Sequence, residues 1–174
     1  MMKAPPGGPL DKILHVEPDA DISFVVHMAL VEFAGFNLVQ CINGNDALAV
    51  APAFRPQLLL IDNVNSGEPG EAIWNRMRNL DGCETLPVVF LTGHVDNTSI
   101  ARLSNAGALA VISKPFLPFQ LPVDLRRAWA DHCQHQGTTR QGLTLVRDDG
   151  APCAGGWNNR PLYDTWSRRP IPGI

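Results

Sequence analysis

The sequence predicts an α/β fold built on a parallel sheet with helices on both faces. Three observations predict it: five short apolar runs without polar alternation, amphipathic segments between them, and a chain of 174 residues that is 45% hydrophobic and 18% charged. A run that lacks alternation is typical of a strand buried on both faces. Strands that alternate with helices favour a parallel sheet with right-handed crossovers. The length fits one domain with some additional chain.

The predicted strands and helices alternate from residue 13 to residue 134. The apolar runs are ILHV (13–16), NLVQCI (37–42), QLLLI (57–61), PVVFL (87–91) and ALAVI (108–112). The predicted helices cover 19–34, 45–53, 69–80, 97–106 and 119–134. The first helix has the clearest period, because its apolar residues recur every three or four positions, and Gly35 is a natural end for it.

The same reading divides the chain into three parts and excludes several classes of protein. Residues 1–9 are predicted to be a flexible lead-in, 10–136 one domain, and 137–174 a mostly irregular tail. The net charge of -3 gives no reason to expect nucleic acid or an anionic membrane as partner. Without a membrane-length apolar run, and with four cysteines that form no CxxC pair, we expect free thiols and a cytoplasmic location.

Polar residues follow four of the predicted strands. Glu17 and Asp19 follow the first, Asp62 the third, Thr92 the fourth and Lys114 the fifth. Because the carboxyl ends of parallel strands meet at one edge of a sheet, these side chains should converge there. An aspartate can accept a phosphoryl group, and a hydroxyl and a lysine can bind the phosphoryl oxygens.

Four segments in this order resemble the receiver domain of two-component response regulators. They are ILHVE, RPQLLLID (55–62), LPVVFLTG (86–93) and GALAVISKPF (107–116), within residues 12–136. The resemblance implies a flavodoxin-like (βα)5 doubly wound sheet with strand order 2-1-3-4-5. It makes Asp62 the phosphoacceptor, Thr92 the switch hydroxyl and Lys114 the phosphate-binding lysine, and it implies a cis Lys114–Pro115 bond.

The chain departs from the family where a divalent cation would bind. Receiver domains normally carry two adjacent acids after the first strand, and here these positions are Glu17 and Pro18. The resemblance therefore implies a weakened Mg²⁺ site made of Glu17, Asp62 and the backbone carbonyl of Val64, with Asp19 joining if its loop shifts. The alternative for Asp19, which we favour, is the N-cap of the first helix, with Asp21 as an acid matched to the helix dipole.

Other departures concern the switch and the partner surface. Val111 replaces an aromatic residue that reports phosphorylation in many receiver domains. Leu117, Phe119 and Leu121 form an apolar cluster that is either a partner surface or is covered by Trp157, Tyr163 and Trp166 of the tail. His132, Cys133 and His135, with Cys153, have the residue types of a zinc site, but a solvated helix end is favoured.

These features support two functions and disfavour a third. The first is a single-domain response regulator that takes phosphoryl from a histidine kinase or phosphotransfer protein and is not itself an enzyme. It would signal to a downstream protein, or form a homodimer, through the face made by the fourth helix, fifth strand and fifth helix. The alternative is a pseudo-receiver, a phosphorylation-independent binding or dimerisation module. A flavin or nucleotide enzyme is disfavoured, since HVEPDAD offers acids where a phosphate would bind.

Overall fold

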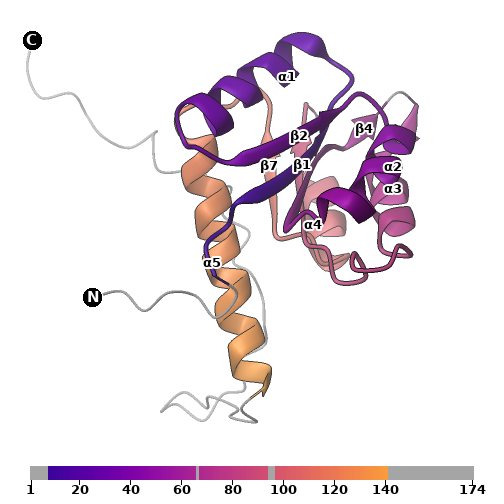
Figure 1. The fold of residues 1–174 in the computed structure, drawn as a ribbon, viewed down its shortest axis with the longest axis vertical. Coiled ribbons are helices and arrows are strands. Elements are labelled where there is room, and N and C mark those ends of the chain that lie inside the picture. Colours follow the sequence, from indigo (N-terminus) through magenta and orange to yellow (C-terminus); the bar gives the residue numbers. More distant parts are fainter. Residues whose placement is uncertain (1–7, 66, 94–96, 141–174) are drawn as a thin grey trace, which may run out of the picture.

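The computed structural model describes residues 8–65, 67–93 and 97–140, which form one α/β domain (Figure 1). Five strands alternate with five α-helices, and a short π-helix and a two-stranded hairpin are added. The strands are β1 (Lys12–Val16), β2 (Asn37–Cys41), β3 (Leu58–Asp62), β4 (Val64–Asn65), β5 (Glu68–Pro69), β6 (Val88–Thr92) and β7 (Ala110–Ser113). The helices are α1 (Ala20–His27), η1 (Met28–Glu32), α2 (Gly44–Phe54), α3 (Gly70–Met77), α4 (Asn97–Asn105) and α5 (Leu121–Arg140).

The five main strands form one parallel sheet in the order β2-β1-β3-β6-β7. With the β4–β5 hairpin set aside, this is the predicted order 2-1-3-4-5, so the predicted fold class is confirmed. The hairpin is a separate antiparallel pair inside the β3–α3 connection, where Val64 pairs with Pro69. The order places β3 in the centre of the sheet, with its carboxyl end between those of β1 and β6.

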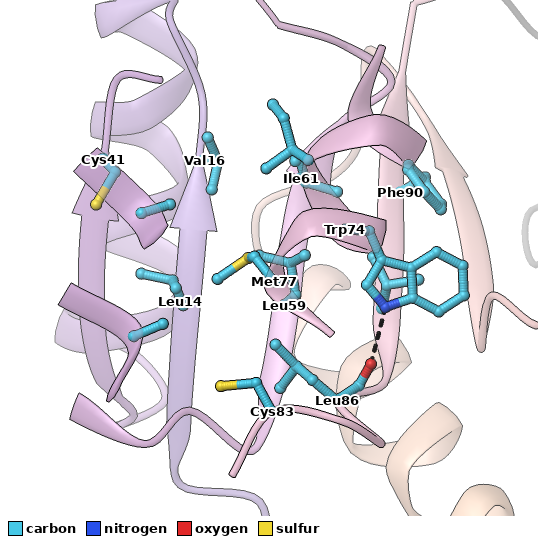
Figure 2. Close-up of a cluster of buried hydrophobic side chains, with 14 of the residues drawn as sticks. Leu14, Val16, Cys41, Leu59, Ile61, Trp74, Met77, Cys83, Leu86 and Phe90 are labelled. Atoms are coloured by element: carbon cyan, nitrogen blue, oxygen red, sulfur yellow. Dashed lines mark hydrogen bonds between the residues drawn. The ribbon is translucent and has the colours of Figure 1, made fainter. Parts of the chain in front are cut away.

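Two apolar clusters fill the two sides of the sheet. On one side, α2, α3 and α4 pack on alternate residues of the central strands, and the cluster includes Trp74, Met77 and Phe90. Trp74 Nε1 donates a hydrogen bond to the backbone oxygen of Leu86 at 2.9 Å (Figure 2), so its buried polar atom has a partner. On the other side, α1, η1 and α5 pack over Ile13, Leu60 and Leu91. Burial on both sides explains why the strand sequences lack polar alternation.

The first and last helices differ from the prediction in detail. The first helical segment covers Ala20–Glu32, but it changes from α-helix to π-helix at Met28. Gly35 follows with φ of 72° and ends the segment, as predicted. The fifth helix, predicted over 119–134, is longer in the structure, because α5 continues to Arg140. Gly137 lowers helix propensity by about 1 kcal/mol but does not end the helix. The rest of the tail, 141–174, lies outside the described residues.

The end of the N-terminal lead-in contacts the domain. The backbone oxygen of Gly8 accepts a hydrogen bond from Trp129 Nε1 at 3.0 Å, and that of Pro9 accepts one from Gln57 Nε2 at 3.2 Å. Leu10, which follows, is buried. Gly8 and Pro9, the last two residues of the predicted lead-in 1–9, are thus bonded to the domain. Residues 1–7 lie outside the described residues.

The predicted apolar cluster is partly buried and partly exposed. Leu121 is buried, whereas Leu117 and Phe119 are exposed. The Phe119 ring lies 5.0 Å from that of Phe33, which follows η1. Phe119, just before α5, therefore lies beside the end of η1. Trp157, Tyr163 and Trp166, the alternative cover, are outside the described residues.

Candidate functional site

Asp62 ends the central strand of the sheet and is the centre of the candidate site. Its side chain is 17% exposed, and Oδ1 accepts a hydrogen bond from the backbone N–H of Val64 at 3.4 Å. Gly70 begins α3 against the backbone of this residue, since a Cβ at Gly70 would lie 2.5 Å from the Asp62 carbonyl oxygen. This close approach requires glycine and fixes where β3 ends relative to α3.

Thr92 lies at the end of the neighbouring strand β6. Its predecessor Leu91 is the register partner of Asp62, and the Leu91 carbonyl accepts a hydrogen bond from Asn63 N–H at 2.9 Å. The Thr92 side chain is buried, and its carbonyl accepts a hydrogen bond from Lys114 N–H at 2.7 Å. Parallel pairing therefore places the predicted hydroxyl at the same edge of the sheet as Asp62 and Lys114.

Lys114 joins the two acidic strand ends. It follows β7, and the Lys114–Pro115 peptide bond is cis, as the resemblance implied. The ammonium Nζ lies 2.5 Å from Glu17 Oε2 and 3.2 Å from Asp62 Oδ2. One cation thus contacts the carboxylates at the ends of β1 and β3, although it comes from a segment almost one hundred residues after Glu17.

Glu17 is the more deeply buried of the two acids. It is 1% exposed, and burial raises the pKa of its carboxyl, while the contact with Lys114 acts in the opposite direction. Its second oxygen, Oε1, accepts a hydrogen bond from Asp19 N–H at 3.1 Å. The Glu17 carboxylate is thus bonded on one oxygen by an ammonium and on the other by a backbone amide.

The Asp19 side chain is used at the start of α1. Its Oδ1 accepts hydrogen bonds from the N–H groups of Asp21 and Ile22, at 2.9 and 3.1 Å, and Asp19 is the N-cap of α1. Asp21 lies in the first turn. The favoured interpretation of this pair, an N-cap and an acid of the first turn, is confirmed.

The residues present do not form the acidic cluster that a divalent cation would need. Within residues 8–65, 67–93 and 97–140, no group of three or more His, Cys, Asp or Glu side chains is placed to hold a metal ion. Pro18 is exposed and brings no side-chain oxygen. The two carboxylates that remain, Glu17 and Asp62, share the Lys114 ammonium. The cation that contacts these acids is therefore the Lys114 ammonium, at the acidic site where receiver domains typically bind Mg²⁺.

His15 is a buried polar residue that the sequence reasoning treated only as part of an apolar run. It is fully buried in β1, and its Nδ1 lies 3.1 Å from Gln40 Nε2. Because an amide nitrogen only donates, Nδ1 accepts and the proton is on Nε2. That atom is buried and has no partner among the described residues. Burial, and then the charge of Lys114, lower the pKa of His15 to about 3. The signal for its burial in the sequence was its place inside ILHV, an apolar run that is typical of a strand buried on both faces.

The β4–β5 hairpin beside Asp62 was also missed. Its Glu68 carboxylate accepts a hydrogen bond from Arg76 Nη1 at 2.9 Å, and Arg76 Nη2 donates to Asn45 Oδ1 at 2.7 Å. The hairpin is therefore linked to both α3 and α2. Val64 in β4 is 65% exposed, which leaves an apolar side chain next to the acid. Gly67 in its turn has φ of 85°, and this glycine was the available signal.

The cysteines and the histidines of α5 were the other candidate residues of the sequence. Cys41, Cys83 and Cys133 are free and buried. His132 stacks near the Trp129 ring at 5.8 Å, and His135 Nδ1 lies 2.7 Å from the Asp131 oxygen, both on α5. Cys153, the fourth residue of the zinc alternative, lies outside the described residues. In the part of the chain that the structure describes, no helix has the length and apolar character to span a membrane.

The chain matches known proteins over the region that holds this site. It is 29% identical over 114 residues to the phosphate regulon regulatory protein PhoB of Pseudomonas aeruginosa, covering 66% of this chain and 49% of PhoB. It is 30% identical over 106 residues to sporulation initiation phosphotransferase F of Bacillus subtilis, covering 61% of this chain and 83% of that protein. A third relative, the probable transcriptional regulator ycf29 of Porphyra purpurea, is matched over 52% of its length. The chain thus spans about half of two of these three relatives.

Solved structures share the fold. The chemotaxis response regulator CheY4 of Vibrio cholerae superposes with a TM-score of 0.62 at 24% identity, covering 68% of this chain and 98% of CheY4. NtrX of Brucella abortus gives 0.66 at 24% identity, covering 79% of this chain and 31% of NtrX. The sequence profile of the response regulator receiver domain matches residues 13–126. With this match over more than half of its length, the chain belongs to the receiver domain family of two-component response regulators.

Proposed function

We propose that Asp62 accepts a phosphoryl group from a phosphohistidine of a histidine kinase or phosphotransfer protein. Receiver domains interact with such proteins. The assignment to this chain rests on one observation: the Asp62 carboxylate lies at the carboxyl end of the central strand, with the Lys114 ammonium 3.2 Å from Oδ2. A carboxylate oxygen would attack phosphorus while the bond from phosphorus to the histidine nitrogen breaks, and the imidazole would leave with the electron pair.

Lys114 and Thr92 would act on the phosphoryl oxygens. Phosphorylation changes the charge at Asp62 from that of one carboxylate to about -2. Lys114 is already in contact with this side chain and would offset part of the added charge. Thr92 at the end of β6 would donate its hydroxyl proton to a phosphoryl oxygen. Both residues belong to the strands nearest α4 and α5, so the proposal makes the α4–β7–α5 face the surface that changes.

The Mg²⁺ site that belongs to this proposal is a weakened one. The oxygens available to an ion are those of Glu17 and Asp62 and the Val64 carbonyl, with Asp19 as a further ligand if it leaves the cap of α1. Two carboxylates and one carbonyl make a poor set for a cation that prefers six oxygen ligands. The groups that act on the phosphoryl group come from the chain itself: the Asp62 carboxylate attacks phosphorus, the Lys114 ammonium offsets the added charge, and the Thr92 hydroxyl binds a phosphoryl oxygen.

The output we propose is protein–protein contact. The structure describes no domain other than the receiver in residues 8–140, and the exposed apolar side chains are candidates for contact. Ile42 after β2 and Val64 after β3 are both about two-thirds exposed at the edge that carries Asp62, where a donor protein would dock. A downstream protein, or a second copy of the chain, would bind the α4–β7–α5 face. The domain is then a phosphoacceptor and not an enzyme with its own substrate.

A second candidate function is the pseudo-receiver, a module that binds partners without being phosphorylated. Two observations favour it. Pro18 removes a carboxylate from the metal region, and Val111 in β7 packs against the apolar cluster without a ring that could turn inward. The intact arrangement of Asp62 and Lys114 is the reason for placing it second.

Intact-mass spectrometry after incubation with acetyl phosphate tests the choice. We expect an adduct of one phosphoryl group on the wild type and none on Asp62→Asn, with Asp81→Asn, an exposed acid elsewhere, behaving as the wild type. The incubation is run with MgCl₂ and with a chelator. An adduct that persists in Asp62→Asn would assign the site elsewhere, and a folded wild type without adduct in either buffer would favour the pseudo-receiver.

A further inference from the structure

The ammonium of Lys114 holds the position between the two acids of the site. It contacts Glu17 Oε2 at 2.5 Å and Asp62 Oδ2 at 3.2 Å. The three side chains are 13%, 1% and 17% exposed, for Lys114, Glu17 and Asp62. Water therefore has little access to the Glu17 contact, and an ion that binds there must displace the ammonium from a sheltered partner.

The other oxygens of the two carboxylates also have donors. Glu17 Oε1 accepts from Asp19 N–H, and Asp62 Oδ1 accepts from Val64 N–H. All four carboxylate oxygens are thus in contact with protein hydrogen-bond donors. Asp19, the nearest further acid, uses its side chain to cap α1. Pro18, which lies between Glu17 and Asp19 in the sequence, has no oxygen in its side chain.

Formal charge shows what the missing acid changes. Two carboxylates and one ammonium carry a single negative charge in total. A divalent ion added to this set would leave a single positive charge in a mostly buried site. With a third carboxylate at position 18, the same lysine and the same ion would be neutralised. The two-carboxylate site with its lysine therefore carries one negative charge less than a three-carboxylate site would, and it attracts a divalent cation correspondingly less.

We propose that Lys114 is the resident counter-ion of Glu17 and Asp62, in place of a divalent cation, in the unphosphorylated protein. Mg²⁺ and the ammonium compete for Glu17 Oε2, and Pro18 decides the competition in favour of the ammonium. The proposal deepens the proposed function, on which it rests for the meaning of the site. Its test needs no phosphoryl donor, so the two can fail separately.

The test is a titration of ¹⁵N-labelled protein with Mn²⁺, used as a paramagnetic substitute for Mg²⁺. Amide signals of residues 17–19 and 62–64 report binding at the site. We compare the wild type with Pro18→Asp, which restores the carboxylate at an exposed position, and with Pro18→Ala, which removes the proline without adding a ligand. We expect no selective broadening in the wild type or Pro18→Ala, and selective broadening in Pro18→Asp with at least about tenfold tighter binding.

A third variant tests the competition itself. Lys114→Met removes the ammonium and keeps both carboxylates, so a folded Lys114→Met should bind Mn²⁺ more tightly than the wild type. If Lys114→Met does not fold, the comparison of Pro18→Asp with Pro18→Ala and the wild type is the test of the proposal. Wild-type binding as tight as that of Pro18→Asp would overturn the proposal, as would a folded Lys114→Met with no gain. Phosphorylation by acetyl phosphate is then measured separately: a missing adduct contradicts the proposed function and leaves the titration result standing.

Discussion

The end of β1 and the ends of β3, β6 and β7 meet in one site but differ in how their residues are used. At β3, β6 and β7, Asp62, Thr92 and Lys114 stand where the receiver pattern puts a phosphoacceptor, a hydroxyl and a lysine. At β1, Glu17 is bonded to the lysine, Pro18 has no polar side chain, and Asp19 caps a helix. The three residues that would act on a phosphoryl group are thus all present. The acids that would bind a metal ion, Glu17 and Asp19, are instead bonded to Lys114 and to the start of α1.

The largest expected effect comes from breaking the contact between Lys114 and the two acids. Lys114→Met leaves Glu17 and Asp62 without their shared cation, and we expect a loss of about 2–3 kcal/mol of unfolding free energy at pH 8. Burial raises the pKa of Glu17, so the folded variant binds a proton more readily than the unfolded chain. The loss should therefore shrink as the pH falls toward 5.

Urea denaturation at pH 8 and pH 5 measures both parts of this prediction. Lys12→Met is the matched control, because the Lys12 ammonium bonds the Phe54 carbonyl oxygen at 3.3 Å and, among the described residues, forms no ion pair with a carboxylate. An equal loss for both lysines at pH 8 would contradict a special role for the contact between Lys114 and the acids.

The next effect concerns the buried histidine of β1. The pKa of His15 in the folded protein is about 3, and an unfolded histidine titrates near 6.5. Between these values the unfolded chain binds the proton, so stability is complete above about pH 6.5 and falls by up to about 1.4 kcal/mol per pH unit below it. His15→Leu should flatten this slope.

Thermal and urea unfolding from pH 7 to pH 4 compare the wild type with His15→Leu. His27→Leu, at a half-exposed histidine of α1, is the control. The titration of Glu17 contributes to all three proteins and cancels in the comparison. A wild type and His15→Leu with the same slope would show that His15 is not the group that destabilises the protein in acid.

A smaller effect tests the use of Asp19 as a cap. Asp19→Ala removes the acceptor of two N–H groups at the start of α1 and should cost about 1 kcal/mol. Asp19→Asn keeps an acceptor oxygen and should cost a few tenths of that. Equal losses for alanine and asparagine, measured by urea denaturation, would mean that the charge of Asp19 matters more than its cap bonds.

The smallest effect is expected at Pro18. Its side chain is exposed, so Pro18→Ala acts mainly by increasing the freedom of the unfolded chain and should lower stability by about 0.5 kcal/mol. A loss above about 2 kcal/mol in the same urea experiment would show that the proline holds the loop between Glu17 and Asp19 in its bonded form, and would make position 18 structural.

The strands and the positions of Asp62 and Thr92 at strand ends could be predicted because their signals are local. Leu58 to Asp62 reads as an apolar run followed by an acid, and the structure has a buried strand with Asp62 at its end. The N-cap position of Asp19 was also visible from its place before an amphipathic segment. The π-helix that begins at Met28 was not visible, because five residues make only about one turn and are too few to change the apolar period of the segment. The end of α5 was missed because Gly137 weakens a helix without necessarily ending it.

The sequence by itself determined the α/β fold class, the strand ends at which polar residues gather, and the absence of an acid at position 18, whereas the strand order was implied only by the family resemblance. Only the tertiary structure decided which group neutralises Glu17, what His15 contacts, and on which side Phe119 lies. The reason is physical: apolar period and strand-end identity act over a few residues, whereas the bond from Lys114 to Glu17 joins segments that meet only when β1, β3 and β7 are in one sheet. Charge pairing of this kind depends on distance and burial, which the order of residues does not contain.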